Sequence, residues 1–296
     1  MDRLRMLRTF ILVADHQSFA EAARKLHISP TQASRGIAQL EAGLGVSLLS
    51  RTTRSVGLTP EGAAYLERCR RILDELDDAD QSLRGEHAAP RGKLRIAAPV
   101  VFGRMHVLPI VAALLKEHRE LNVELSLSDR IVRLVEEGID ATVRIADLSD
   151  SALHAIRLAE VRRVLVATPE YLARNGTPSE IAQLHDHDLI AFEFPIGYEW
   201  RFTTSGRPSV RVEPRLSTNS VAATLDAVLE HLGIARLLSY QVQEQVAAGR
   251  LVYLLEEFEP PPVPVSLVFQ GSRRSSPNVS AFIRAAQAYC RGRAFD

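Results

Sequence analysis

Residues 29–41 read SPTQASRGIAQLE, a stretch that carries the marks of one particular kind of helix. Ser29, Pro30 and Gln32 are residues with which an α-helix begins: a cap, a first-turn proline and a capping-box partner. Behind them, an apolar stripe recurs at helical spacing, formed by Ala33, Ile37 and Leu40. The rest of the surface carries short polar side chains and one cation: Thr31, Gln32, Ser34 and Arg35. We expect a helix that buries one face and offers the other to a polar partner.

Two further helices precede this stretch. The first is predicted by an apolar stripe with spacings of three and four, made of Leu4, Leu7, Ile11 and Ala14, with Phe10 and Val13 beside it. The second is SFAEAARKL (18–26), with Ser18 as its N-cap and Glu21 as capping-box partner. Only His27 and Ile28 separate it from Ser29. Two short helices joined so tightly predict a helix-turn-helix, whose second helix fits the DNA major groove.

The outer face of that second helix has the chemistry needed to read DNA. Arg35 can pair with both acceptors of a guanine edge, a contact worth about 1 to 3 kcal/mol of discrimination. Thr31, Gln32 and Ser34 can reach bases or phosphates. The alternative is an ordinary solvated helix face.

The next segment, GLGVSLLSRTTRSVGLTPEG (43–62), predicts a winged hairpin. Gly43 and Gly45 end the helix, and a short apolar strand, a basic turn and a returning strand follow. The turn residues suit contact with phosphates or the minor groove: Arg51, Thr52, Thr53 and Arg54. A dinucleotide-binding loop is disfavoured, because the third glycine, the preceding strand and the later acid are missing.

A long linker helix is expected next, with Thr59 as N-cap and Pro60 in its first turn, running to about Arg84. Its apolar repeat is Leu66, Cys69, Leu73 and Leu76, continued by Asp80 and Leu83. We expect this repeat to pair with a second copy of the chain; the alternative is packing on the chain's own winged domain. RGEHAAPRG (84–92) predicts a hinge.

Composition and charge limit the remaining possibilities. The 296 residues are 46% apolar, enough for two or three domains, and their net charge is +0. Residues 1–60 carry eight Lys or Arg against four Asp or Glu, whereas residues 61–90 carry four against eight, so a +4 head precedes a −4 segment. Neither a signal peptide nor a charge-free run of about 18 residues is visible. With only Cys69 and Cys290, which form no CxxC motif, we expect a cytoplasmic protein that makes no contact with a membrane.

The segment from Ser18 to Gly62 resembles the amino-terminal domain of LysR-type transcriptional regulators. The likeness continues through GKLRIAAPVVFGR (92–104), VELSLSDRIVRLVEEGIDATVRIADL (123–148) and RRVLVATPEYLARNGTP (162–178). By position, Thr31, Gln32, Ser34 and Arg35 match the family's groove-facing residues, and Arg54 matches its wing arginine. Gly36 departs from the larger residue usual there, and a mid-helix glycine costs about 1 kcal/mol relative to alanine, which suggests a looser helix or a closer approach to DNA.

This resemblance implies an α/β protein with an α-rich winged helix-turn-helix head and a two-lobed effector domain similar to type II periplasmic binding proteins. We place the DNA-binding domain at 1–58, the linker helix and hinge at 59–90, and the regulatory domain at 91–296. The implied partners are operator DNA, a small-molecule effector, a second copy in dimers or tetramers, and RNA polymerase. No cofactor is implied.

The chain after residue 92 alternates predicted strands and helices, as in KLRIAAP, VELSLS and DATVRIA with helical segments between them. We expect a parallel α/β lobe, a second lobe beginning at RRVLVATP with a hairpin about TSGRP, and a return to the first lobe with PVSLVFQG. Two chain crossings between the lobes would place a cleft at the carboxyl ends of strands, where helix amides can hold a small anion.

The predicted cleft residues come from four segments: Ala98, Pro99, Val100, Val101 and Phe102; Arg144 and Ile145; Thr218, Asn219 and Ser220; and Arg236. Many family members carry Ser or Thr where Val101 stands, so a hydroxyl donor is missing. This favours a more apolar effector, or none. Asn219 is also interpreted as a helix cap, and Arg144 as a solvated or ion-paired strand residue.

Catalysis finds little support, because no G-x-S-x-G elbow, H-E-x-x-H motif or P-loop is present. HDH (185–187) is interpreted as a solvated loop rather than a metal site, and Cys69 as an apolar residue rather than a redox switch. We therefore predict neither catalytic residues nor metal ligands. The rival interpretations are a solute-binding protein and an enzyme with an appended DNA-binding head.

Overall fold

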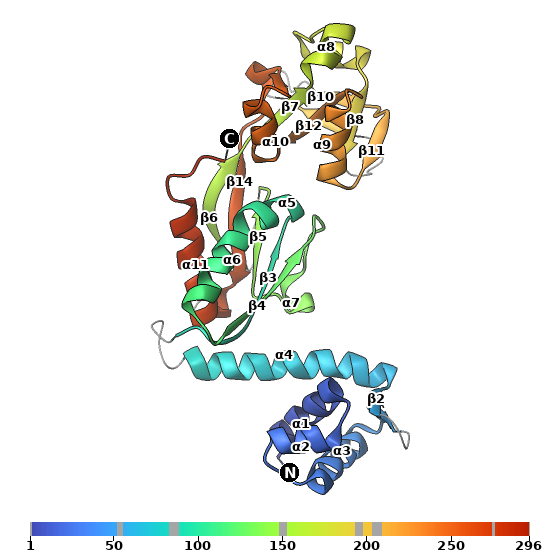
Figure 1. Ribbon diagram of the computed structural model, residues 1–296, viewed down its shortest axis with the longest axis vertical. Helices are drawn as coiled ribbons and strands as arrows, with labels where there is room; N and C mark the ends of the chain where they lie inside the picture. The colour runs from blue at the N-terminus through green and yellow to red at the C-terminus, as the bar shows by residue number, and fades with distance from the viewer. Residues whose placement is uncertain are drawn as a thin grey trace. The chain divides into compact units, whose positions relative to one another are not determined.

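The computed structural model describes residues 2–51, 56–82, 89–147, 153–192, 198–202, 209–273 and 276–295 (Figure 1). The chain divides into two compact units, Met1–Ala88 and Ala89–Asp296. None of the helices in the described ranges combines the length and the apolarity needed to cross a membrane.

The first unit is a helix-turn-helix with a wing, as predicted. Its elements are α1 (Arg3–His16), α2 (Phe19–Lys25), α3 (Pro30–Leu44), β1 (Leu49–Arg51), β2 (Val56–Leu58) and α4 (Pro60–Ser82). The two strands pair antiparallel and form the predicted hairpin. Several predicted positions lie outside the described residues: Thr52, Thr53 and Arg54 of the wing, and Leu83 and Arg84 of the linker.

The helices of the motif begin at side-chain caps that the sequence predicts. The Ser29 hydroxyl accepts a hydrogen bond from the Gln32 N–H at 3.2 Å, and the Gln32 side-chain oxygen accepts one from the Ser29 N–H at 3.0 Å. At α2, the Ser18 hydroxyl accepts from the Glu21 N–H, while the Glu21 carboxylate pairs with Arg24. The capping box is therefore complete at α3, whereas at α2 only the Ser18 half is present.

Side chains also connect the wing to its neighbouring helices. The Glu41 carboxylate, on α3, accepts hydrogen bonds from the N–H groups of Leu48 and Leu49 at 2.8 and 3.1 Å. The Thr59 hydroxyl accepts from the Gly62 N–H at 2.9 Å and thereby caps α4. These contacts fix the first wing strand to α3 and the start of α4 to its capping residue.

Helix α1 buries a face that is rotated from the predicted stripe. Its buried residues are Met6, Leu7, Thr9, Phe10 and Val13. Of the predicted stripe, Leu4 is 38% exposed, and Ile11 and Ala14 are half-buried. The reason is that α1 packs against α2, α3 and α4 at once, so its buried face is broad and centred on Phe10.

The predicted self-pairing of the α4 repeat is wrong for three of its positions. Leu66, Cys69 and Leu73 lie in the core of the first unit, all under 10% exposed. The first unit buries these residues by itself, because the broad apolar face of α1 reaches α4. Ile72, the residue before Leu73 on α4, is 50% exposed.

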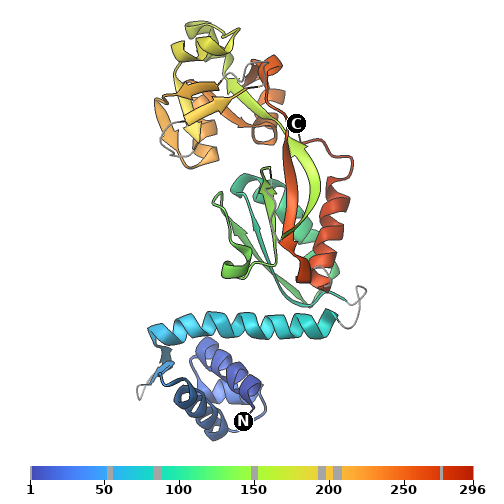
Figure 2. The same ribbon diagram turned by 180° about the vertical axis from the view of Figure 1, so that it is seen from behind.

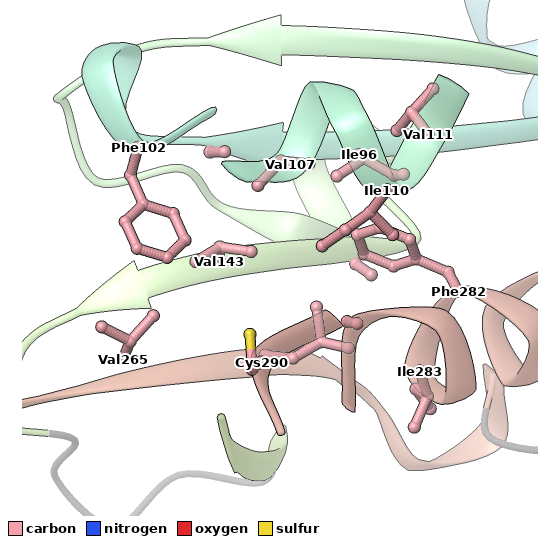
Figure 3. Close-up of a cluster of buried hydrophobic side chains, with 14 of the residues drawn as sticks. Ile96, Phe102, Val107, Ile110, Val111, Val143, Val265, Phe282, Ile283 and Cys290 are labelled. Atoms are coloured by element: carbon pink, nitrogen blue, oxygen red, sulfur yellow. The ribbon is translucent and has the colours of Figure 1, made fainter. Parts of the chain in front are cut away.

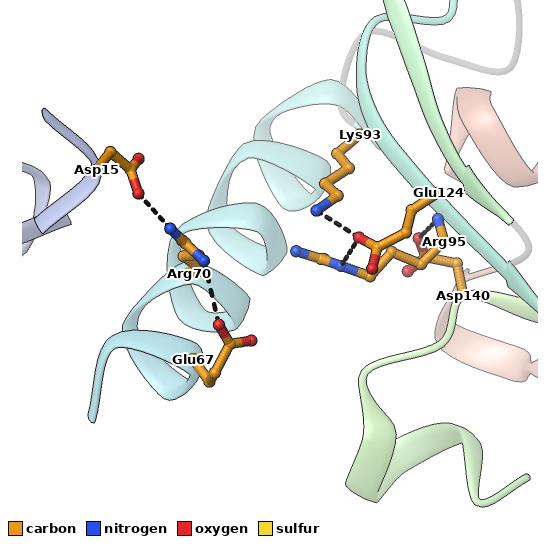
Figure 4. A network of polar contacts seen from close by, with 7 residues as sticks. All are labelled: Asp15, Glu67, Arg70, Lys93, Arg95, Glu124 and Asp140. Atoms are coloured by element: carbon orange, nitrogen blue, oxygen red, sulfur yellow. Dashed lines mark hydrogen bonds and ion pairs between the residues drawn. The ribbon is translucent and has the colours of Figure 1, made fainter. Parts of the chain in front are cut away.

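Polar contacts join elements within each unit (Figure 4). In the first unit, Arg70 of α4 pairs with Asp15 of α1, and its Nη1 donates to Glu67 at 3.1 Å. In the second unit, Glu124 of β4 pairs with Lys93 and Arg95 of β3, and the Arg95 N–H donates to the carboxylate of Asp140, which directly precedes β5.

The second unit contains two five-stranded sheets. The first has the order β4-β3-β5-β14-β6, from β3 (Gly92–Ala98), β4 (Leu121–Leu127), β5 (Ala141–Ile145), β6 (Leu153–Val161) and β14 (Val263–Gln270). The second has the order β11-β8-β12-β7-β13, from β7 (Arg163–Ala167), β8 (Leu189–Phe192), β11 (Leu216–Thr218), β12 (Ile234–Leu238) and β13 (Val252–Leu254). Each sheet is the centre of one lobe, and the predicted hairpin is formed by β9 (Tyr198–Arg201) and β10 (Ser209–Val212).

Helices flank the sheets of both lobes (Figures 1 and 2). The first lobe carries α5 (Val100–Phe102), which continues through a π-helical turn (Gly103–Val107) into α6 (Leu108–Glu117), then α7 (Leu134–Glu137) and α11 (Pro277–Cys290). The second carries α8 (Pro169–Asn175), α9 (Val221–Leu229), α10 (Ser239–Ala247) and 3₁₀ turns at Ile181–Asp186 and Glu256–Phe258. Helices α6 and α11 pack side by side, and their apolar faces meet the first sheet through Val107, Ile110, Phe282, Val143 and Val265 (Figure 3).

The two-lobed α/β architecture is confirmed, but the predicted parallel first lobe is mixed. β3 pairs parallel with β4 and β5, whereas β14 runs antiparallel to β5 and β6. The reason is the return path: β14 enters the sheet from the second lobe and against the direction of β5. The strands β6 and β13 and the helix α10 were not predicted from the sequence.

Candidate functional site

Helix α3 carries the predicted polar residues on its outer surface. Thr31, Gln32 and Arg35 are exposed and Ser34 is half-buried. The opposite face is buried. Its three apolar residues are each at most 1% exposed: Ala33, Ile37 and Leu40. Gly36 is also buried, so it faces the interior of the unit and offers no closer approach of this surface to a partner.

The exposed polar side chains of α3 differ in whether they already form hydrogen bonds within the chain. The side chains of Thr31 and Arg35 make no hydrogen bond or ion pair with any residue in the described part of the chain. The Gln32 oxygen is engaged by the Ser29 N–H, which leaves its amide group as a donor. Arg35 can therefore donate to two acceptors on one base, and Gln32 can donate to another.

A cavity of about 520 Å³ opens on the first lobe, at the carboxyl ends of β3, β4 and β5. Four predicted cleft residues line it: Ala98, Pro99, Arg144 and Ile145. The sequence reasoning missed the loop from Ser128 to Val132, which also lines the cavity, and Asp147 beyond β5. Their position directly after two predicted strands was the available signal, because adjacent parallel strands end at one edge of a sheet.

The helix amides expected to hold a small anion are partly taken by the protein itself. The Val100 N–H, at the start of α5, donates to the Asp129 carboxylate at 3.0 Å. The cations of the cavity are also engaged. Arg130 pairs with Glu137 at 2.5 Å, and Arg144 Nη2 donates a hydrogen bond to the Val132 carbonyl at 2.8 Å.

Three of the predicted cleft residues lie elsewhere than in the cavity wall. Val100 is 41% exposed, and Val101 packs against the apolar cores of both lobes. Phe102 is 1% exposed and belongs to the core of the first lobe. The helical geometry explains this division, because consecutive side chains on α5 point in directions about 100° apart.

The predicted residues of the second lobe form the start of α9 and a cation that lies over an aromatic ring. Ser220, rather than Asn219, caps α9: its hydroxyl accepts from the Ala223 N–H at 3.3 Å. Thr218 accepts from the Ser220 N–H at 3.2 Å, while Asn219 is exposed. The Arg236 guanidinium lies over a phenylalanine ring, that of Phe202, at 5.6 Å.

A buried histidine lies where the first lobe meets α10. The His106 ring is 4.7 Å from that of Phe102, 4.8 Å from Phe295 and 5.8 Å from Tyr240, measured between centroids. Burial, together with the positive charge of Arg293, lowers the pKa of His106 to about 4. The ring is therefore neutral at pH 7, and its Nε2 makes no hydrogen bond.

Among the described residues, no group of three or more His, Cys, Asp or Glu side chains is arranged to hold a metal ion. Of HDH, His187 lies within 3.3 Å of the Tyr171 hydroxyl, whereas His185 and Asp186 are exposed. Burial raises the pKa of the Cys69 thiol, which suits an apolar role rather than a reactive one.

Two family models match the chain. The bacterial regulatory helix-turn-helix protein model of the lysR family matches residues 4–63, and the LysR substrate binding domain model matches residues 87–291. Together they span both structural units.

Curated relatives and solved structures give the same result over nearly the whole chain. The HTH-type transcriptional regulator PtxR of Pseudomonas aeruginosa is 36% identical over 294 residues, covering 97% of this chain and 92% of the relative. DmlR of Escherichia coli is 36% identical over 258 residues, or 86% and 84%. The structure of CrgA, a LysR-type transcriptional regulator from Neisseria meningitidis, matches with a TM-score of 0.62 and 28% identity over 98% and 99% of the two chains. AphB, a virulence activator of Vibrio cholerae, matches with a TM-score of 0.61 and 26% identity over 97% and 99%.

Proposed function

This chain belongs to the LysR family of transcriptional regulators, and from this premise we propose that α3 reads a specific operator while a ligand in the second unit controls that reading. One observation carries the proposal: a capped helix exposes Thr31, Gln32 and Arg35 and buries its other face. An exposed arginine and short polar side chains on such a helix suit direct contact with base edges.

We assign the base contacts to Arg35 and Gln32, and contacts with bases or phosphates to Thr31 and Ser34. The wing would hold the DNA backbone or the minor groove through Arg51, Thr53 and Arg54. Two copies of the chain would place two such helices on half-sites one helical turn or more apart, so the operator would be an interrupted palindrome.

The first-lobe cavity is the proposed effector site, with Ala98, Pro99, Arg144 and Ile145 in its wall. Val101, which follows the cavity-lining Pro99 by two residues, packs against the cores of both lobes, so a ligand that moves this segment can alter how the lobes meet. A coupling free energy of about 1 to 3 kcal/mol between ligand and DNA suffices to change operator choice. The relatives are transcriptional regulators, and we propose a cytoplasmic role without catalysis, exercised through contact with RNA polymerase.

The test is a gel-shift titration with duplexes selected from randomised DNA. Arg35→Ala should weaken binding to the selected site by about 1 to 3 kcal/mol and relax the preference at one base pair. Arg211→Ala removes an exposed arginine of the second unit and serves as the control, with affinity unchanged. Equal affinities for the Arg35 variant and the parent, or equal losses in both variants, would contradict the proposal.

A further inference from the structure

The segment that follows α11 returns to the interior of the second unit. Residues 291–294 are exposed, whereas only 3% of Phe295 is exposed. Gly292 permits the change of direction, because its φ of +72° lies in the left-handed region that glycine adopts without strain. The buried aromatic side chain of Phe295 thus anchors an otherwise exposed segment.

The Phe295 ring packs on the first lobe. Its centroid lies 5.7 Å from that of Phe102, on α5, and 4.8 Å from that of His106, in the π-helical turn after α5. Tyr240, on α10 of the second lobe, enters the same core, with its ring 5.3 Å from that of Phe102. One aromatic cluster therefore contains side chains from elements of both lobes.

The main chain of Phe295 is bonded to the second lobe. Its carbonyl accepts a hydrogen bond from the Ser239 hydroxyl at 2.9 Å. Ser239 is the first residue of α10 and is 0% exposed, so water does not compete for this bond. Phe295 contacts the first lobe with its ring and the second lobe with its carbonyl.

The same serine is bonded to the first crossing of the chain between the lobes. Arg162 separates β6 of the first lobe from β7 of the second. Its N–H donates to the Ser239 hydroxyl and its carbonyl accepts from the Ser239 N–H, both at 3.0 Å. The Arg162 guanidinium pairs at 3.1 Å with both carboxylate oxygens of Glu259, which lies on the second crossing, before β14. Phe295 is thus fixed beside the two crossings, where a hinge between the lobes would lie.

A rotation of the lobes cannot preserve both contacts of Phe295. A change in the backbone angles at Arg162 moves the start of α10 relative to α5, which separates the Ser239 hydroxyl from the pocket that holds the ring. Either the ring then leaves its apolar pocket, or the buried Phe295 carbonyl loses its donor, and each change is unfavourable. We propose that Phe295 is an interlobe clasp, which holds the second unit at one angle between its lobes and must be released before that angle changes.

The alternative is that Phe295 stabilises the first lobe as any core residue does, without setting the angle. Ile283 provides the matched comparison, because it belongs to the same apolar core and is 8% exposed. It lies on α11, and no printed bond joins it to the second lobe. Truncation of either residue should lower the unfolding temperature, so stability does not separate the two roles, whereas the distance between the lobes does.

The experiment measures that distance by electron–electron resonance between two spin labels on the full chain. The labels are attached to Arg284→Cys on α11 and Ala173→Cys on α8, both exposed positions. The native cysteines, Cys69 and Cys290, are buried. An excess of unlabelled chain ensures that the measured distances lie within one copy.

The parent should give one narrow distance distribution, and so should Ile283→Ala. Phe295→Ala and Ser239→Ala should each give a shifted or broader distribution, and Phe295→Leu, which keeps apolar bulk, should lie between the parent and Phe295→Ala. Circular dichroism establishes which variants are folded. Should Phe295→Ala not fold, Phe295→Leu and Ser239→Ala decide in the same way.

The proposal fails if the folded Phe295 and Ser239 variants keep the parent's distribution, or if Ile283→Ala changes the distribution as much as they do. The measurement uses neither DNA nor a ligand. It therefore tests the clasp independently of the operator reading proposed for α3.

Discussion

The Asp129 carboxylate accepts a hydrogen bond from the Val100 N–H at 3.0 Å. Asp129 follows the end of β4, and Val100 follows the end of β3 and begins α5. The acid after one strand therefore accepts a hydrogen bond from the first amide of the helix after the neighbouring strand. Helix N-termini favour negative charge, and here the chain supplies that charge itself.

Replacing Asp129 by alanine should destabilise the second unit by about 1 kcal/mol, the usual effect of losing an N-cap acceptor. Asp129→Asn should cost less, because an amide oxygen can still accept the bond. Urea unfolding measures both. Asp186→Ala removes an exposed acid and should have little effect; a loss equal to that of Asp129→Ala would argue against the capping role.

Truncation of two neighbouring residues of α4 should destabilise the first unit to very different extents. Leu73 is 8% exposed in the core of the first unit, and Leu73→Ala should cost about 2 to 5 kcal/mol of its unfolding free energy. Ile72 is 50% exposed, so Ile72→Ala should cost under about 1 kcal/mol. Denaturation followed by circular dichroism checks this. If Leu73→Ala were harmless to folding and only dissociated the oligomer, the original self-pairing interpretation would be restored.

Two glycines of the first unit make a second matched pair. A Cβ at Gly62 would lie 1.9 Å from the Leu48 carbonyl oxygen, so Gly62→Ala should destabilise by about 1 to 3 kcal/mol or more. Nothing lies within 4 Å of a Cβ at Gly43, inside α3, and Gly43→Ala should stabilise by roughly 0.5 to 1 kcal/mol. Opposite shifts in thermal unfolding are expected, and shifts of the same sign would contradict the packing described around Leu48.

His106 should make the second unit less stable in mild acid. Its pKa is about 4 when folded and 6.5 ordinarily, so between these values the unfolded chain binds a proton that the folded chain excludes. Stability therefore falls as the pH drops from 6.5 through 4, by on the order of 3 kcal/mol. His106→Leu should abolish this dependence, whereas His185→Gln, on the surface, should keep it. Parallel stability profiles for the parent and His106→Leu would refute the assignment.

Local signals in the sequence predicted much of the first unit. The Ser29, Gln32 and Thr59 caps act over three residues, so their pattern is readable without knowledge of the fold. Such local patterns did not predict which residues form the centre of the buried face of α1. Phe10 and Leu73 belong to one core although they lie far apart in sequence, and periodicity alone does not say how many neighbours a helix has.

The second unit was predicted in outline, and its site only in part. Ala98, Pro99, Arg144 and Ile145 were found because they end predicted strands. The Asp129 contact was missed because it joins loops after two strands whose adjacency the sequence alone does not reveal.

The path of β14 determines when the first sheet can be completed during synthesis on the ribosome. β14 lies between β5 and β6 in the first sheet, yet it is synthesised after the whole second lobe. The first sheet thus remains divided, with β5 and β6 presenting unpaired backbone groups, until residue 270 has left the exit tunnel. Such late, long-range closure slows folding and prolongs the exposure of aggregation-prone edges. Nascent chains stalled within the second lobe should therefore be the ones that chaperones retain.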